Sequence, residues 1–203
     1  MESGGEFNAG NSNVTFDGNI SSGSVANSGE TDFYDLTIAA STTFRPGTDS
    51  YIGIAGTLTN NGTLAAATNH NIIEFKKDGS FTIPNPNGST EGYHTLVISG
   101  TGTKTLPTPL YVWHDFTNNG TVDAGTGTVT MSNLSSTEGF ATTIGGSSST
   151  TFYNLIIDNP IAQVHTTADI SIASGGTLTI NADAVFKPGA AYTVGGAGTL
   201  TGY

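Results

Sequence analysis

The sequence predicts an all-β protein that folds as a right-handed parallel β-helix, or β-solenoid, of about ten coils of about 20 residues each. Three observations predict this class. Short apolar–polar alternations occur in place of any helical pattern, a long internal repeat recurs about every 58 residues, and a finer spacing of about 20 residues lies inside the long repeat.

Half-buried strands are indicated by short runs in which Val, Ile, Leu or Phe alternates with Thr, Ser or Asn. No window of the chain places apolar residues at the i, i+3, i+4, i+7 positions of an amphipathic helix. Glycine, with 28 of the 203 residues, and Asn-Gly pairs separate the runs and suit tight corners. The expected strands are residues 13–16, 35–38, 56–59, 128–131, 170–173 and 177–180.

The long repeat is clearest in three segments, "FYDLTI", "YHTLVI" and "FYNLII", which are centred on Leu36, Leu96 and Leu155. A second landmark agrees with this period, because "GTLTNNGTLAAA" (56–67) matches "HDFTNNGTVDAG" (114–125) at a step of about 58 residues. The repeat therefore predicts that Leu36, Leu96 and Leu155 are equivalent inward residues of one wall. We expect the same of Phe16, Phe75 and Met131.

The finer spacing predicts stacked coils rather than separate domains. "GTLT" at 176–179 recurs at 198–201, a step of about 22 residues, and the same step separates Leu36 from Leu58. Coils of this length would pair their strands about 4.8 Å apart and align inward side chains in ladders. The rival is an Ig-like or jelly-roll β-sandwich, which also has short, regularly spaced strands. We expect one domain, residues 1–203, with imperfect repeats at about 7–63, 64–121 and 122–180 and a partial coil at 181–203.

The segments "TFYNLIID", "GTLTNNGTL" and "DFTNNGTVDAGTGTVTMS" resemble the repeats of large secreted microbial surface proteins, of the parallel β-helix type found in adhesins and autotransporter-like passengers. The resemblance covers most of residues 7–201. It implies an extracellular, cell-surface protein, and it brings no set of catalytic residues with it.

Composition limits the classes of partner. The net charge is −11, with five Lys plus Arg against sixteen Asp plus Glu, so we expect no binding to a nucleic-acid backbone. The chain has no cysteine, which excludes disulfides and thiolate chemistry. No apolar run is long enough to cross a bilayer, so the sequence predicts no membrane span. The Ser- and Thr-rich, Lys-poor composition favours an extracellular location.

Catalytic chemistry is not indicated. No pair of carboxylates has a spacing typical of glycoside hydrolysis, and the only cations are Arg45, Lys76, Lys77, Lys104 and Lys187. We therefore predict no enzyme, no cofactor and no metal site. The histidines are interpreted as ordinary wall residues, although His94 and His114 are one coil apart and could stack. The four are His70, His94, His114 and His165.

Two further groups of residues are candidates for binding sites. Asp17, Asp35, Asp115 and Asp123 lie near expected turns, but no calcium-loop motif surrounds them. Five aromatic residues could form a platform that stacks on sugars: Tyr51, Tyr111, Trp113, Tyr192 and Tyr203. Tyr111 and Trp113 share one face of a strand, which we interpret instead as core or a partly covered wall.

The sequence thus favours a non-catalytic structural protein: a fibre or filament subunit, or an adhesin stalk. The end of the chain, "GTLTGY", stops where an earlier copy continues into a segment that the start of the chain resembles. We therefore expect head-to-tail contact with a second copy or with neighbouring repeats of a longer chain. Its candidate interface residues are Phe7, Leu200 and Tyr203. The alternative is a carbohydrate-binding or polysaccharide-degrading β-helix, with glycans as partners.

Overall fold

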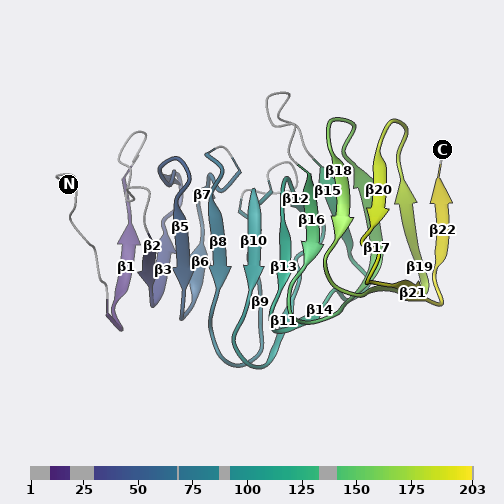
Figure 1. Ribbon diagram of the computed structural model, residues 1–203. Helices are drawn as coiled ribbons and strands as arrows, with labels where there is room; N and C mark the ends of the chain where they lie inside the picture. Colours follow the sequence, from purple (N-terminus) through teal and green to yellow (C-terminus); the bar gives the residue numbers. More distant parts are fainter. Residues whose placement is uncertain (1–9, 19–29, 68, 87–91, 133–140, 203) are drawn as a thin grey trace.

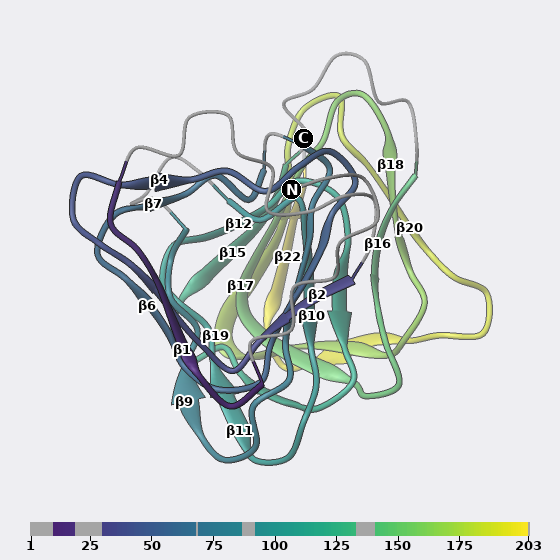
Figure 2. The same ribbon diagram turned by 90° about the vertical axis from the view of Figure 1, so that its left-hand side faces the viewer.

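The chain winds into a parallel β-solenoid of about eight turns (Figure 1). The structure is a computed structural model and describes residues 10–18, 30–67, 69–86, 92–132 and 141–202, within which every named element is a β-strand. Viewed from the N-terminal end, the chain turns clockwise as it recedes, so the solenoid is right-handed (Figure 2). The predicted fold class is confirmed, and the β-sandwich is excluded because the strand pairs are parallel. The expected ten coils are too many.

The strands of successive turns lie on three faces. The first face is one continuous sheet of eight strands: β2 (Glu30–Phe33), β5 (Tyr51–Ile54), β8 (Ile72–Phe75), β10 (Thr95–Ile98), β13 (Phe116–Asn118), β16 (Thr142–Gly145), β18 (Gln163–Thr166) and β20 (Val185–Pro188).

The second and third faces are divided into smaller sheets. The second face holds β1 (Asn13–Phe16), β3 (Asp35–Ile38), β6 (Leu58–Asn60), β9 (Phe81–Thr82), β11 (Thr103–Thr105), β14 (Thr121–Asp123), the first halves of β17 (Thr150–Asp158) and β19 (Ile170–Ile180), and β21 (Val194–Gly196). The third face holds β4 (Thr43–Phe44), β7 (Thr63–Leu64), β12 (Leu110–Val112), β15 (Thr128–Ser132), the second halves of β17 and β19, and β22 (Thr199–Gly202).

Coil length varies because the corners differ. On the first face Leu96 is paired with Ile73 in the preceding coil and with Phe116 in the following one, so these coils hold about 20 to 23 residues. The next pair on this face, Phe116 with Ile144, spans about 28 residues, because nine residues of sequence separate β15 from β16. The coils are therefore longer on average than the expected length of about 20 residues, and fewer of them are needed to accommodate the chain.

The core is one continuous cluster of inward side chains along the axis. Leu36, Leu96 and Leu155 belong to it and are each 0% exposed, so their predicted burial in a common core is confirmed. Their predicted equivalence on one wall is wrong. Leu36 lies in β3 on the second face, Leu96 in β10 on the first, and Leu155 in β17 on the third.

The cause is the length of the repeat relative to the coil. A step of about 59 residues equals about two and two-thirds coils of about 22 residues, so each copy of the motif falls one face away from the last. Phe16, Phe75 and Met131 show the same displacement, in β1, β8 and β15. The long repeat is real in the sequence, but it is not a whole number of turns.

A recurrent hydrogen bond joins successive coils at their corners. An Asp or Asn carboxyl or amide oxygen accepts the backbone N–H, and in most cases also the hydroxyl, of a Thr one coil later. The pairs are Asp35–Thr57, Asp78–Thr101, Asp115–Thr143, Asn154–Thr177 and Asp169–Thr193. Each of these pairs, here called a clasp, gives a backbone amide a side-chain acceptor in the preceding coil.

The clasps favour ionised carboxylates. The Thr101 amide and hydroxyl lower the pKa of Asp78, and those of Thr193 lower the pKa of Asp169. Burial acts to raise the pKa of Asp115, but hydrogen bonds from His114 and Thr143 outweigh it and the net pKa is lowered.

We predict that these clasps make stability acid-sensitive. A carboxyl whose folded pKa lies below its ordinary value, 3.8, stabilises the fold at higher pH and loses this contribution as the pH falls through the lowered pKa. The double variant Asp78→Asn/Asp169→Asn keeps an oxygen acceptor but no charge. Denaturant unfolding of both proteins from about pH 7 to about pH 2 should show the wild type more stable at neutral pH and the difference closing in acid. A difference that stays constant down to the lowest pH would contradict this account.

Candidate assembly interface

The C-terminal end of the solenoid is formed by strands with one free edge. Among the described residues, β20 pairs only with β18, and β21 and β22 pair only with β19. Unpaired N–H and C=O groups on such an edge are a template for further strand pairing, and natural proteins usually cover or charge them. At this end no described strand covers them (Figure 1).

Leu200 is the last member of a ladder of inward aliphatic residues on the third face. The strand registers place Leu110, Val129, Leu155, Leu178 and Leu200 over one another in that order. The first four are at most 4% exposed, whereas Leu200 is 67% exposed. Leu200 thus has the inward position of a core residue but lacks a described coil above it.

Val194 and Phe186 complete this surface. Val194 stacks over the buried Ile170 and is 37% exposed, and Phe186 stacks over the buried Val164 and is half-buried. We call Phe186, Val194 and Leu200 the end patch. No charged residue occurs between Pro188 and Gly202, so charge does not protect the edges of β21 and β22.

The N-terminal end also presents a strand edge. Among the described residues, β1 pairs only with β3. Its two inward residues, Val14 and Phe16, are half-buried, and Phe16 stacks on Phe44 with ring centroids 4.6 Å apart. Both ends of the solenoid therefore present a strand edge with apolar side chains, but the residues at the two ends differ. Phe7 and Tyr203, the other predicted interface residues, lie outside the described residues.

The histidines form an arrangement that the sequence only suggested. His70, His94 and His114 come from three consecutive coils, with ring centroids 5.1 Å and 5.0 Å apart, and the second pair is nearly parallel. Asp49 lies 3.3 Å from His70 and Asp115 lies 3.0 Å from His114. His165 lies in β18 and outside this stack.

Other predicted site residues have structural roles. Within the described part of the chain, no group of three or more His, Asp or Glu side chains is arranged to hold a metal ion. Asp35 and Asp115 make clasps, and Asp123 accepts the Gly125 N–H. Tyr111 and Trp113 flank the buried Val112 and point outward, and each is half-buried. Of the two predicted alternatives, they therefore form a partly covered wall and not core.

Lys104 is the one buried cation among the described residues, and its burial was not anticipated. Its side chain is 0% exposed in the second-face ladder between Phe81 and Val122. Its Nζ donates to the carbonyls of Gly79, Thr101 and Gly102 at 3.3, 2.6 and 3.2 Å. Burial lowers the pKa of Lys104, and the nearby charge of Asp78 offsets this only in part. The alternation in "TKT" was the signal that Lys104 points inward.

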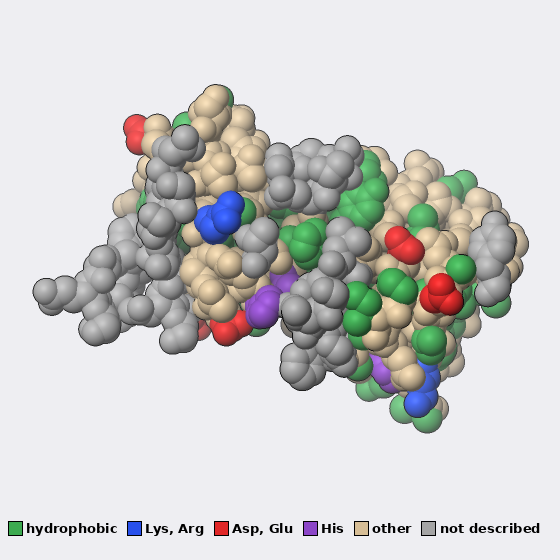
Figure 3. Space-filling model, turned by 90° about the horizontal axis from the view of Figure 1, so that it is seen from above, with side chains coloured by type: hydrophobic (Ala, Val, Ile, Leu, Met, Phe, Trp, Pro, Cys, Tyr) green, Lys and Arg blue, Asp and Glu red, His purple; other side chains and the backbone are tan. Residues whose placement is uncertain are grey.

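No protein family, no curated protein and no solved structure significantly matches this chain. The described residues include no helix long and apolar enough to cross a membrane. The visible surface in Figure 3 carries few charged side chains among the described residues. The fold is thus a parallel β-solenoid, and its last described strands carry an exposed apolar patch.

Proposed function

We propose that the protein is a non-catalytic structural module, a subunit of an extracellular surface fibre or adhesin stalk. In this proposal the C-terminal end of one molecule stacks on the N-terminal end of the next. The observation that supports it most strongly is the exposure of Leu200, an inward ladder residue whose four predecessors are buried. The Ser- and Thr-rich, Lys-poor composition supports the extracellular placement.

Stacking would continue the solenoid across the junction. Free edges of β20, β21 and β22 would gain ladder hydrogen bonds, and the end patch would be buried against the Val14 and Phe16 edge. Full burial of an aliphatic side chain contributes about 1.5–3 kcal/mol. Because the two ends are different surfaces, the contact does not close on itself, and repeated stacking gives a filament.

Net charge opposes this stacking. Each molecule carries −11, so two copies repel at low ionic strength, and salt screens the repulsion. The end patch contributes no charge of its own to this repulsion, since Phe186, Val194 and Leu200 are all apolar. Assembly should therefore increase with salt, opposite to the behaviour of an interface held by ion pairs.

We predict that one charge in the end patch prevents assembly. Sedimentation velocity over a concentration series at about physiological salt should show the wild type forming oligomers of increasing size, and Leu200→Asp remaining monomeric. Thr201→Asp is the matched control, because Thr201 lies in the same strand with its hydroxyl bonded to Thr179 at 3.0 Å on the outer surface. It should still assemble. A wild type that stays monomeric at every concentration, or a Leu200→Asp variant that assembles equally, would refute the proposal.

A further inference from the structure

The second face has a step halfway along the solenoid. Between the second and third faces, the inward residues Val122 and Val129 are seven positions apart, with a turn between them. One coil later, Phe152 and Leu155 are only three positions apart, and the single strand β17 runs through the corner. The corner of the earlier coil therefore projects beyond the coil that follows it.

Because of this step, β14 and β17 are consecutive strands of the face that do not pair. Among the described residues β14 pairs only with β11, and residues 150–152 pair only with β19. Hydrogen bonds close the opening at both ends, from Ser148 N–H to Asn118 O at 3.0 Å and from Asn154 N–H to Gly127 O at 3.1 Å. What remains is a short slot in the wall.

Backbone groups face this slot. In a strand, alternate residues direct N–H and C=O to the same neighbour. Leu106 N–H donates to Asp123 O, so Asp123 faces β11 and Val122 faces the slot. Thr150 N–H donates to Asp169 O, so Thr150 faces β19 and Thr151 faces the slot. In the described structure no hydrogen bond joins Val122 to Thr151, and both keep donors and acceptors for a ligand.

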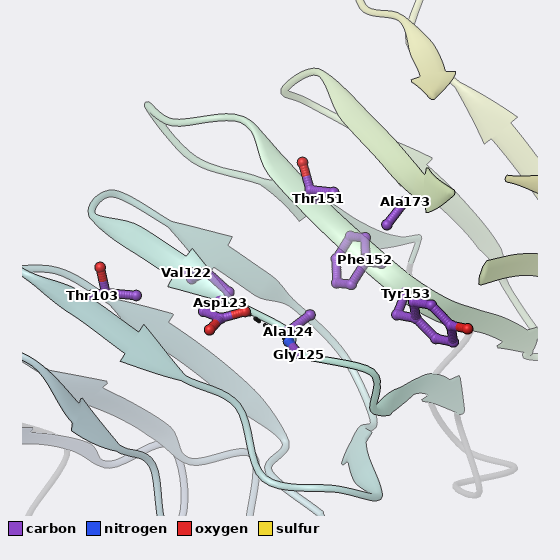
Figure 4. Close-up of a pocket in the computed structure, with 9 residues that line it drawn as sticks. All are labelled: Thr103, Val122, Asp123, Ala124, Gly125, Thr151, Phe152, Tyr153 and Ala173. Carbon is purple, nitrogen blue, oxygen red and sulfur yellow. Dashed lines mark hydrogen bonds between the residues drawn. The ribbon is translucent and has the colours of Figure 1, made fainter. Parts of the chain in front are cut away.

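The slot has the size and lining of a small-ligand site. Its volume is about 380 Å³, within the usual range for ligand pockets. In Figure 4, Thr151, Phe152 and Tyr153 of β17 lie on one side of the slot, and β14 with Asp123 lies on the other side. The lining residues are Thr103, Val122, Asp123, Ala124, Gly125, Thr151, Phe152, Tyr153 and Ala173.

We propose that this slot binds a single neutral sugar ring. The lining contains one carboxylate, Asp123, and no cation, which disfavours anionic ligands. A pyranose has an apolar C–H face, which suits the ring of Tyr153, and a rim of hydroxyls. The hydroxyls both donate and accept, as do the backbone of Val122, the backbone of Thr151 and the Thr103 hydroxyl. The site lies on the side of the solenoid, so it is independent of stacking at the ends.

The test uses the intact chain and methyl glycosides of glucose, galactose, mannose and N-acetylglucosamine, with methyl glucuronide as an anionic comparison. Saturation-transfer difference NMR and calorimetry should show one neutral glycoside binding with a Kd of about 1 mM, as expected for a ligand of this size. Ala173→Trp fills the slot and should weaken binding at least about tenfold. Ala182→Trp, in an exposed turn, adds the same side chain elsewhere and should bind as the wild type does.

Several results would overturn the proposal. These are no binding by any neutral glycoside, equal binding by Ala173→Trp, or binding of the glucuronide as tight as that of the neutral sugars. Tyr153→Ala provides a second variant in case Ala173→Trp does not fold. It removes the stacking ring from a half-buried position and should also weaken binding about tenfold.

Discussion

Replacing Leu96 by Ala should lower the free energy of unfolding by about 2–5 kcal/mol. Leu96 is 0% exposed in the middle of the eight-stranded first face, paired with Ile73 on one side and Phe116 on the other. Truncation removes buried methyl groups and leaves a cavity that a ladder with fixed strand spacing cannot close. Chemical denaturation followed by circular dichroism measures the loss.

Leu200→Ala is the matched control for this variant. It is the same substitution at a position that is also inward but 67% exposed, so it should cost less than about 0.5 kcal/mol when measured on monomeric protein. Similar losses at both positions would mean either that burial along the ladder does not determine stability or that the end patch is covered in solution.

Lys104→Met should destabilise the fold by about 2–4 kcal/mol although methionine is apolar and of similar size. Three carbonyl oxygens, of Gly79, Thr101 and Gly102, receive hydrogen bonds from the Lys104 ammonium group. The thioether donates none, so the three part-buried hydrogen bonds would be lost together with their charged donor.

Lys77→Met is the control for the lysine variant. Lys77 is half-buried and makes one hydrogen bond, to the Thr57 hydroxyl at 2.8 Å, so its replacement should cost less than about 1 kcal/mol. If Lys104→Met were as stable as the wild type, the three carbonyls would have to be satisfied in another way, for instance by water entering the corner. Comparing the two variants in the same denaturation assay separates the loss of a buried donor from the loss of a surface charge.

The sequence contained the fold class because two periods agree. Alternation within segments such as 35–38 indicates strands, and recurrence at about 22 residues, as in the two "GTLT" segments, indicates stacked coils. Which face of the solenoid each residue lies on could not be predicted from the sequence. Leu36, Leu96 and Leu155 match in sequence, yet corners of unequal length and a repeat of about two and two-thirds coils place them on three faces.

The site features divide in the same way. The uncharged, aliphatic tail around Leu200 was readable from the sequence, because the ladder spacing identifies an inward position. The carbonyl oxygens that surround the Lys104 ammonium group could not be predicted from the sequence. They come from two successive coils, and only the stacking of those coils brings them together. The slot between β14 and β17 depends on a change in corner length from one coil to the next, and local patterns carry no signal for it.

Electron cryomicroscopy of the concentrated wild-type protein at about physiological salt tests the central claim most directly. Eight coils at about 4.8 Å each give a subunit about 38 Å long. End-to-end stacking predicts unbranched filaments one molecule wide, with an axial repeat of about 38 Å and the strand spacing of about 4.8 Å continuous across the junctions. Separate rods of about that length at the highest concentration, with no end-to-end contact, would contradict the account.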